Sequence, residues 1–115
     1  MAHRVVLELT EGASGKVETG LGNIRHLLAE LAAEGVEVEL VAHSDGITAF
    51  YRRGNVQAEA ISRLAVQGVR FVACRATMRN RGLTEEDILP VAQMAPSGIT
   101  EIVRRQEEGW SYVRP

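Results

Sequence analysis

The stretch Val69-Arg70-Phe71-Val72-Ala73-Cys74 decides the fold of this chain. It is a short, mostly apolar run, which is the pattern of a buried β-strand, and it ends at a cysteine. Helical patterns lie on both sides, because residues 55–67 precede it and residues 75–80 follow it. Parallel strands need crossover connections, so this order predicts a mostly parallel sheet with helices on both faces.

The same alternation extends along the 115 residues of the chain. Further strands are predicted at residues 5–9, 36–42, 91–95 and 110–113. The sequence therefore predicts an α/β protein: a single three-layer α/β/α domain over residues 1–115, with a mostly parallel five-stranded sheet. Trp110 and Tyr112 should face the same side of the last strand and cover a core edge or a subunit interface.

Apolar residues at helical spacing predict the connecting helices. The first helix should follow a loop at residues 10–16 and end before Gly35, which fits a C-terminal cap. Asn55 is expected to cap the second long helix, and Thr84 opens a short one. The apolar positions that form these helical patterns are Leu21, Ile24, Leu27, Leu28 and Leu31 in the first helix, Val56, Ala60, Ile61 and Leu64 on one face of the second, and Ile99, Ile102 and Val103 in the last.

The composition argues against several classes of function. Apolar residues make up 45% and charged residues 24%, and the net charge is −2. Without a basic excess, the chain lacks the charge expected of a nucleic-acid-binding protein. No apolar run reaches the roughly 18 residues of a membrane span, and the N-terminus lacks a signal-peptide pattern. The only cysteine, Cys74, cannot form an internal disulfide, so we expect a cytoplasmic protein with no membrane partner.

Residues that end the predicted strands are the first candidates for a functional site. Open parallel sheets bind ligands beyond the carboxyl ends of their strands. The residues concerned are Gly12, His43, Ser44, Asp45, Gly46, Cys74, Arg75 and Ser97. They combine a nucleophile, a titratable base and small turn residues. We predict catalytic roles for Cys74 and His43 and ligand binding by the other six.

Cys74 has the surroundings expected of a reactive thiol. A helix over residues 75–80 would place the thiol near a helix N-terminus, where unpaired N–H groups favour an anion. Arg75 and Arg79 add positive charge nearby. Both effects lower the pKa of a thiol and increase the thiolate fraction. The alternative is an inert buried thiol, because free cysteine is among the most buried residue types.

His43 could act as a general base, a proton shuttle or a hydrogen-bond donor to an anion. The plainer interpretation is a strand-end histidine bonded to a turn carbonyl, and Asp45 is likewise typical of a turn. The three histidines share no metal-ligand spacing, so no metal site is predicted. Residues 12–16 lack the full phosphate-loop spacing, because Val17 stands where Ser or Thr is required, and no cofactor is predicted.

Several of these segments together resemble one known family. The strand that ends in Cys74 is followed, after two residues, by Thr77-Met78. This motif, with residues 41–47, 83–92, 96–102 and 106–112, resembles the DsrE/DsrF-like proteins, small α/β domains associated with sulfur relay. The resemblance implies that Cys74 carries sulfane sulfur as a persulfide. It also implies homo-oligomers, either trimers or hexamers, and partner proteins that donate or accept sulfur.

Two functions follow as expectations. In the first, the protein is a sulfurtransferase or persulfide carrier in which the Cys74 thiolate accepts sulfur and passes it to an acceptor thiol. Arg75 would stabilise the anionic persulfide and His43 would move protons. In the second, the domain is a non-catalytic module that binds a small ligand or supports an assembly, and Cys74 only lines its pocket. A thiol sensor of oxidants would use the same cysteine.

Overall fold

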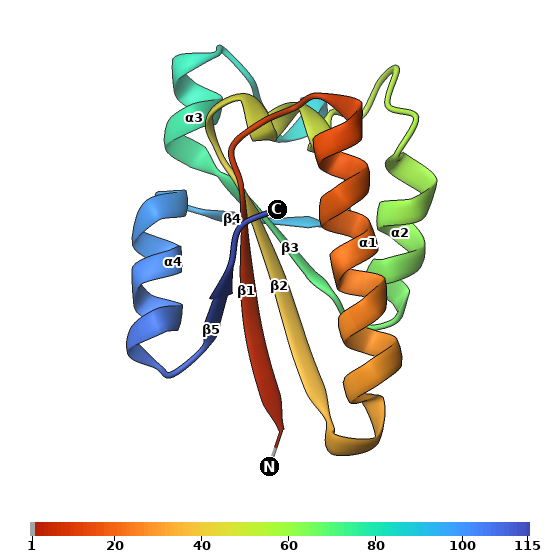
Figure 1. The fold of residues 1–115 in the computed structure, drawn as a ribbon. Helices are drawn as coiled ribbons and strands as arrows, with labels where there is room; N and C mark the ends of the chain where they lie inside the picture. The colour runs from red at the N-terminus through yellow and green to blue at the C-terminus, as the bar shows by residue number, and fades with distance from the viewer. Residues whose placement is uncertain (1) are drawn as a thin grey trace.

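The computed structural model describes residues 2–115 and contains one five-stranded sheet (Figure 1). The strands are β1 (His3–Leu9), β2 (Val36–Ala42), β3 (Arg70–Cys74), β4 (Ala92–Ala95) and β5 (Ser111–Val113). Their order across the sheet is β4-β3-β2-β1-β5, and all four neighbouring pairs are parallel. The predicted fold class is confirmed, and the sheet is parallel in every one of these pairs rather than mostly so.

Helices cover both faces of the sheet and its carboxyl edge. In Figure 1, α1 (Ser14–Leu31) and α2 (Ala58–Val66) lie on one face, and α4 (Gly98–Glu107) lies on the other. Beyond the carboxyl ends of the strands lie α3 (Arg75–Asn80) and the 3₁₀ helix η2 (Ser44–Phe50). Two shorter 3₁₀ helices are η1 (Ala32–Glu34) and η3 (Glu85–Asp87). Within the described part of the chain, each helix is too short or too polar to span a membrane.

The larger core lies between the sheet and helices α1 and α2. Leu7, Leu40 and Phe71 are neighbours in register on β1, β2 and β3, and each is at most 2% exposed. The ring of Phe50 meets that of Phe71 edge to face, with centroids 5.8 Å apart. Burying a side chain of this kind stabilises the fold by roughly 1.5–3 kcal/mol. These contacts hold the strands in the register that brings their carboxyl ends together.

The face beneath α4 has a smaller apolar core. Val41 and Val72 are neighbours in register there, and they pack in one cluster with Ile102 of α4 and with Trp110. The cluster also includes Val6 and Ala95. Since α4 is the helix that covers this face, it must be anchored firmly over β1, β2 and β3, which it contacts.

A buried group of charged residues supplies much of that anchoring. Glu39, in the middle of β2, is fully buried and receives hydrogen bonds from Arg105 of α4 at 3.1 and 3.3 Å. Arg70 approaches the same carboxylate at 3.3 Å, and Arg105 also binds Glu101 at 3.1 Å. Burial, followed by the hydrogen bond to Glu101, raises the pKa of Glu39 to about 7, against the opposing effect of Arg105. Below about pH 7 Glu39 therefore keeps its proton, which it can donate to Glu101.

The structure differs from the expected helices in three places. First, α1 begins at Ser14, inside the segment expected to be a loop, because Val17 is buried and its N–H already binds the Ala13 carbonyl. Second, α2 begins only at Ala58. The Asn55 side chain caps the preceding turn instead, by accepting the Gln57 N–H at 2.9 Å.

The third difference concerns exposed apolar residues. Val56 lies before α2 and is 87% exposed, so its predicted place on the apolar face of that helix is wrong. On α4, Ile102 is buried, whereas Ile99 and Val103 are 54% and 47% exposed. The apolar residues of α4 cover a wider part of the helix surface than the face that contacts the sheet. These side chains therefore leave an apolar outer surface on α4 in the isolated chain.

Candidate functional site

Two glycines fix the loops at the carboxyl edge of the sheet. A β-carbon on Gly46 would lie 2.0 Å from the Leu9 carbonyl oxygen, which no other residue could tolerate without movement. A β-carbon on Gly12 would lie 2.0 Å from the Thr48 hydroxyl oxygen. Both predicted site glycines therefore let the backbone pack closely. Their packing holds η2 against the end of β1, beside Cys74 and His43.

Cys74 ends β3 and is also the N-cap residue of α3. It is 5% exposed, and its Sγ accepts the Thr77 N–H at 3.4 Å. Burial favours the neutral thiol, but hydrogen bonding, chiefly from the Thr77 side chain and N–H, outweighs it and lowers the pKa of Cys74. The sulfur therefore has a hydrogen-bonding environment that suits an anion.

The main donor is Thr77, at the N-terminus of α3, rather than the predicted arginines. Gly98, the first residue of α4, packs against Cys74, whereas the Ala76 N–H donates to the Pro96 carbonyl at 3.2 Å. Ser44 adds a further link, because its N–H donates to the Thr77 hydroxyl oxygen at 3.0 Å. Arg75 is directed to Glu85, 3.7 Å away. We attribute the lowered pKa of the thiol chiefly to hydrogen bonding and not to guanidinium charge.

His43 lies beside Cys74 on the same face of the sheet. Ala42 pairs with Ala73, so the two residues that follow are neighbours across β2 and β3. A β-carbon on Gly98 would lie 3.2 Å from the β-carbon of His43 and 3.3 Å from that of Cys74. The first residue of α4 is therefore packed against both, and only a glycine fits there without displacing them.

The His43 ring is held by a carboxylate. Its Nε2 lies 2.6 Å from Oε2 of Glu8, and the two side chains are only 12% and 11% exposed. Its Nδ1 lies 3.3 Å from the Ser44 hydroxyl. Glu8 also accepts a hydrogen bond from the Tyr112 hydroxyl. Burial opposes ionisation of Glu8, but the bonds from Tyr112 and His43, with the charge of Arg114, lower its pKa, so the carboxylate is ionised.

The remaining predicted site residues lie around this centre. Ser97 is the N-cap residue of α4 and accepts the Thr100 N–H at 3.4 Å. Asp45 is exposed and pairs with Arg81. These contacts give Ser97 and Asp45 local structural roles at the ends of helices. Within residues 2–115, no group of three or more His, Cys, Asp or Glu side chains is arranged to hold a metal ion.

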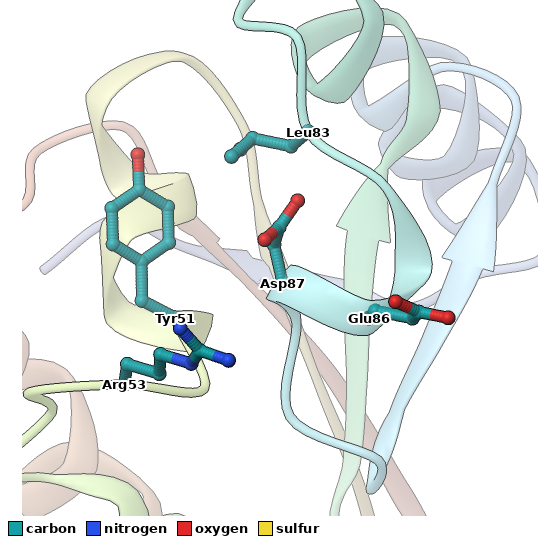
Figure 2. Close-up of a pocket in the computed structure, with 5 residues that line it drawn as sticks. All are labelled: Tyr51, Arg53, Leu83, Glu86 and Asp87. Atoms are coloured by element: carbon teal, nitrogen blue, oxygen red, sulfur yellow. The ribbon is translucent and has the colours of Figure 1, made fainter.

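A cavity of about 290 Å³ lies apart from these residues (Figure 2). It is lined by Tyr51, Arg53, Leu83, Glu86 and Asp87. Tyr51 stands on one side of it, with Leu83 and Asp87 on the other, as Figure 2 shows. The Asp87 carboxylate is already engaged in the capping box with Thr84. Since neither Cys74 nor His43 lines this cavity, its shape says nothing about chemistry at the thiol.

Comparison with known proteins agrees with this geometry. The DsrE/DsrF-like family matches residues 15–115. The chain belongs to that family. The solved structure of MTH1491 from Methanobacterium thermoautotrophicum, a protein of unknown function, matches with a TM-score of 0.93 and 40% identity, over 98% of this chain and 99% of that one.

A more distant structure supports the fold alone. The ychN protein from E. coli matches over 100% of both chains with a TM-score of 0.76, but only 17% of the residues are identical. None of the curated proteins matches this chain. The fold is thus common to DsrE/DsrF-like proteins, while the role of the thiol must be argued from this chain's own residues.

Sequence reasoning assigns no site role to three residues of the centre, although Thr77 is part of the motif that carries the family resemblance. The sequence signal for Glu8 is that it is the one charged residue in the apolar run at residues 5–9. Gly98 carried only a turn signal beside Ser97. Thr77 stands three residues after Cys74, at the spacing that an N-cap side chain needs to accept a backbone N–H.

Proposed function

We propose that this protein carries sulfane sulfur as a persulfide on Cys74, as a persulfide carrier or sulfurtransferase. The observation that carries this proposal is the hydrogen bond from the Thr77 N–H to the Cys74 sulfur at 3.4 Å, which together with the Thr77 hydroxyl lowers the pKa of Cys74 despite its burial. A thiolate is the nucleophilic form of cysteine. The association of the DsrE/DsrF-like family with sulfur relay, which the resemblance implies, points to the same chemistry.

The proposed reaction has two steps without net oxidation. In loading, the Cys74 thiolate attacks the outer sulfur of a donor persulfide, R–S–SH. A new S–S bond forms to Cys74, the donor's S–S bond breaks, and its electron pair leaves on R–S⁻. In discharge, an acceptor thiolate R′–S⁻ attacks the outer sulfur, R′–S–SH forms, and Cys74 leaves as a thiolate. The electrons balance between donor and acceptor, so no external oxidant is needed.

His43 is the group proposed to move the protons. In loading it gives a proton to the departing R–S⁻, and in discharge it takes one from the incoming R′–SH. Its position beside Cys74, with both packed against Gly98, supports this role. Arg75 is a weaker candidate for stabilising the persulfide, because its guanidinium group pairs with Glu85.

Mass spectrometry of the intact protein tests the proposal. After incubation with a sulfane-sulfur donor and removal of excess reagent, the native chain should gain about 32 Da, the mass of one sulfur atom. A reductant should remove the added mass, and Cys74→Ser should not acquire it. A native protein that stays unmodified under conditions that load a reference persulfide carrier would refute the proposal.

One observation favours the alternative, a non-catalytic ligand-binding or assembly module. Cys74 is only 5% exposed, as expected for a thiol that packs rather than reacts. In that case Cys74→Ser would retain the full biological activity of the protein. Loading with sulfur distinguishes the two functions, because a packing thiol has no reason to accept it.

We further propose that the chain forms a homo-oligomer, either a trimer or a hexamer, in the cytoplasm, where sulfur passes between it and partner proteins. The exposed Ile99 and Val103 on the outer surface of α4 support an interface. A reducing compartment suits a protein whose single cysteine must stay free between transfers. Sedimentation at micromolar concentration should show an assembly, and a 12.6 kDa monomer alone would contradict it.

A further inference from the structure

We infer that Glu8 is a positioning residue for His43: it fixes which ring nitrogen of His43 exchanges protons during the sulfur transfer at Cys74. This inference rests on the proposed function. Glu8 lies on β1 in the central sheet, and it acts on the site through its contact with His43 rather than by contacting the thiol.

The geometry of the pair leaves the imidazole little freedom. Nε2 of His43 lies 2.6 Å from the Glu8 carboxylate, and both side chains are nearly buried. The adjacent ring carbon, Cδ2, packs against Gly98, where a β-carbon would lie 3.3 Å from it. Two neighbouring ring atoms are therefore held by a carboxylate and by the first residue of α4.

Glu8 is itself held in place and ionised. The Tyr112 hydroxyl on β5 donates to its carboxylate. Arg114, which follows β5, adds positive charge that favours the ionised form. His43, Tyr112 and Arg114 are the titratable or charged groups that lower the pKa of Glu8, and they lie just after β2, in β5 and just after β5, respectively.

An ionised carboxylate accepts hydrogen bonds but cannot donate one. Nε2 of a neutral His43 must therefore carry its proton toward Glu8, which leaves Nδ1 as the free basic nitrogen. Nδ1 lies 3.3 Å from the Ser44 hydroxyl. The Ser44 N–H in turn binds Thr77, the residue that donates to Cys74. The basic nitrogen is thus directed to the loop that borders the thiol.

Without the charge on Glu8, neutral His43 should no longer favour the tautomer that carries its proton on Nε2. A glutamine has both a carbonyl oxygen and an NH₂ group, so it can satisfy either tautomer of His43. A substantial fraction of neutral rings would then carry the proton on Nδ1 and could not accept one there. General acid–base catalysis typically contributes 10²–10⁴-fold, so losing the correct tautomer should slow transfer by about tenfold or more.

The test uses Glu8→Gln in the full chain, with Glu37→Gln as the matched control. Glu37 is an exposed carboxylate on β2, outside the site. Cys74 is first loaded with a low-molecular-weight persulfide, and discharge to a small thiol is followed by mass in a single turnover between about pH 6 and pH 9. Glu8→Gln should reach the same final loading but discharge about tenfold or more slowly, with a changed pH profile.

A second measurement does not depend on sulfur transfer. ¹⁵N NMR of the imidazole distinguishes the two tautomers, and neutral His43 should be protonated at Nε2 in the native chain and mixed in Glu8→Gln. Tyr112→Phe, at a residue that is 40% exposed, should slow discharge by a smaller factor because it only loosens Glu8. This variant provides the test if Glu8→Gln does not fold.

The outcomes separate the two proposals. A native chain that never loads sulfur overturns the proposed function and, with it, the role of Glu8 in transfer. A native chain that loads and discharges, while Glu8→Gln keeps the native rate and pH profile, overturns the role of Glu8 alone. Slower discharge together with an unchanged Nε2–H tautomer also overturns it, because the effect would then be only structural.

Discussion

Replacing Glu39 with glutamine should remove a fall in stability that the native chain shows as pH rises from about 5 to about 8. The unfolded carboxyl ionises near its ordinary pKa of 4.5, whereas the folded one keeps its proton until about pH 7. Between these values the folded state binds more protons than the unfolded state. The stability that protonated Glu39 contributes is therefore fully present below the unfolded pKa of 4.5 and is lost as pH rises through the folded pKa of about 7.

The structure sets the size of this effect. Glu39 is fully buried, so solvent does not screen its ionisation. Each unit of pKa shift corresponds to about 1.4 kcal/mol, so a rise from 4.5 to about 7 gives a ceiling of about 3 kcal/mol. The lowered pKa of Glu101, chiefly from its hydrogen bond with Glu39, acts only below about pH 4.5 and leaves this range unchanged. We expect native stability to fall by about 1–3 kcal/mol between about pH 5 and about pH 8.

Glutamine keeps the shape and the hydrogen-bonding groups of Glu39 without the ionisation. Its carbonyl can accept from Arg105 and its NH₂ can donate to Glu101. The variant should match the native chain at about pH 5 and exceed it in stability by about 1–3 kcal/mol at about pH 8.

Urea unfolding at several pH values measures this difference. Trp110 is the only tryptophan, it is buried, and the Arg105 guanidinium lies 4.7 Å from its ring, so its fluorescence reports on the α4 face. Glu37→Gln, at an exposed site on β2, controls for the loss of one carboxylate. If the difference between Glu39→Gln and the native chain is the same at every pH, the reasoning about the buried proton is wrong.

Two further variants test the packing and the donors at the carboxyl edge. Thr77→Val removes a hydroxyl donor to the sulfur, so the pKa of Cys74 should rise. Alkylation of Cys74 by iodoacetamide near neutral pH should then slow by about tenfold, as expected for the loss of one hydrogen bond to a charged group. An unchanged pH dependence of alkylation would count against the role of Thr77 as a donor. Gly46→Ala places a β-carbon 2.0 Å from the Leu9 carbonyl oxygen, so urea unfolding should show a loss of about 3 kcal/mol or more, and a loss below about 1 kcal/mol would mean that the loop moves freely.

The strands were the most predictable part of the fold. Residues 36–42 form β2 as predicted, and the predicted helix at 75–80 is α3 with the same bounds. Both predictions rest on local patterns, because the hydrophobic period and the capping residues lie within a few consecutive positions of the sequence. The errors fall where local signals are ambiguous. A cap at Asn55 predicts that Val56 lies inside α2, but Asn55 caps a turn that precedes the helix.

The candidate site was predictable only in part, for a reason of geometry. The positions of Cys74 and His43 at strand ends follow from the alternation of strands and helices. The contact between His43 and Glu8 requires that β1 lie beside β2, and the bond from Tyr112 requires β5 on the other side of β1. Strand order is set by packing across the whole sheet. A single sequence shows the carboxylate in β1 but not its partners.

The burial of Cys74 and its lowered pKa are opposing facts that must be weighed together. Burial alone raises the pKa of a thiol, so an inert core cysteine needs no donors around its sulfur. Here the Thr77 N–H donates to that sulfur at 3.4 Å, and Gly98, which lies against Cys74 and His43, must lack a side chain for α4 to approach. Such an arrangement stabilises the anion and contributes little to a neutral thiol. Because the donors outweigh burial, the site is better explained by a sulfur that carries charge than by one that only fills space.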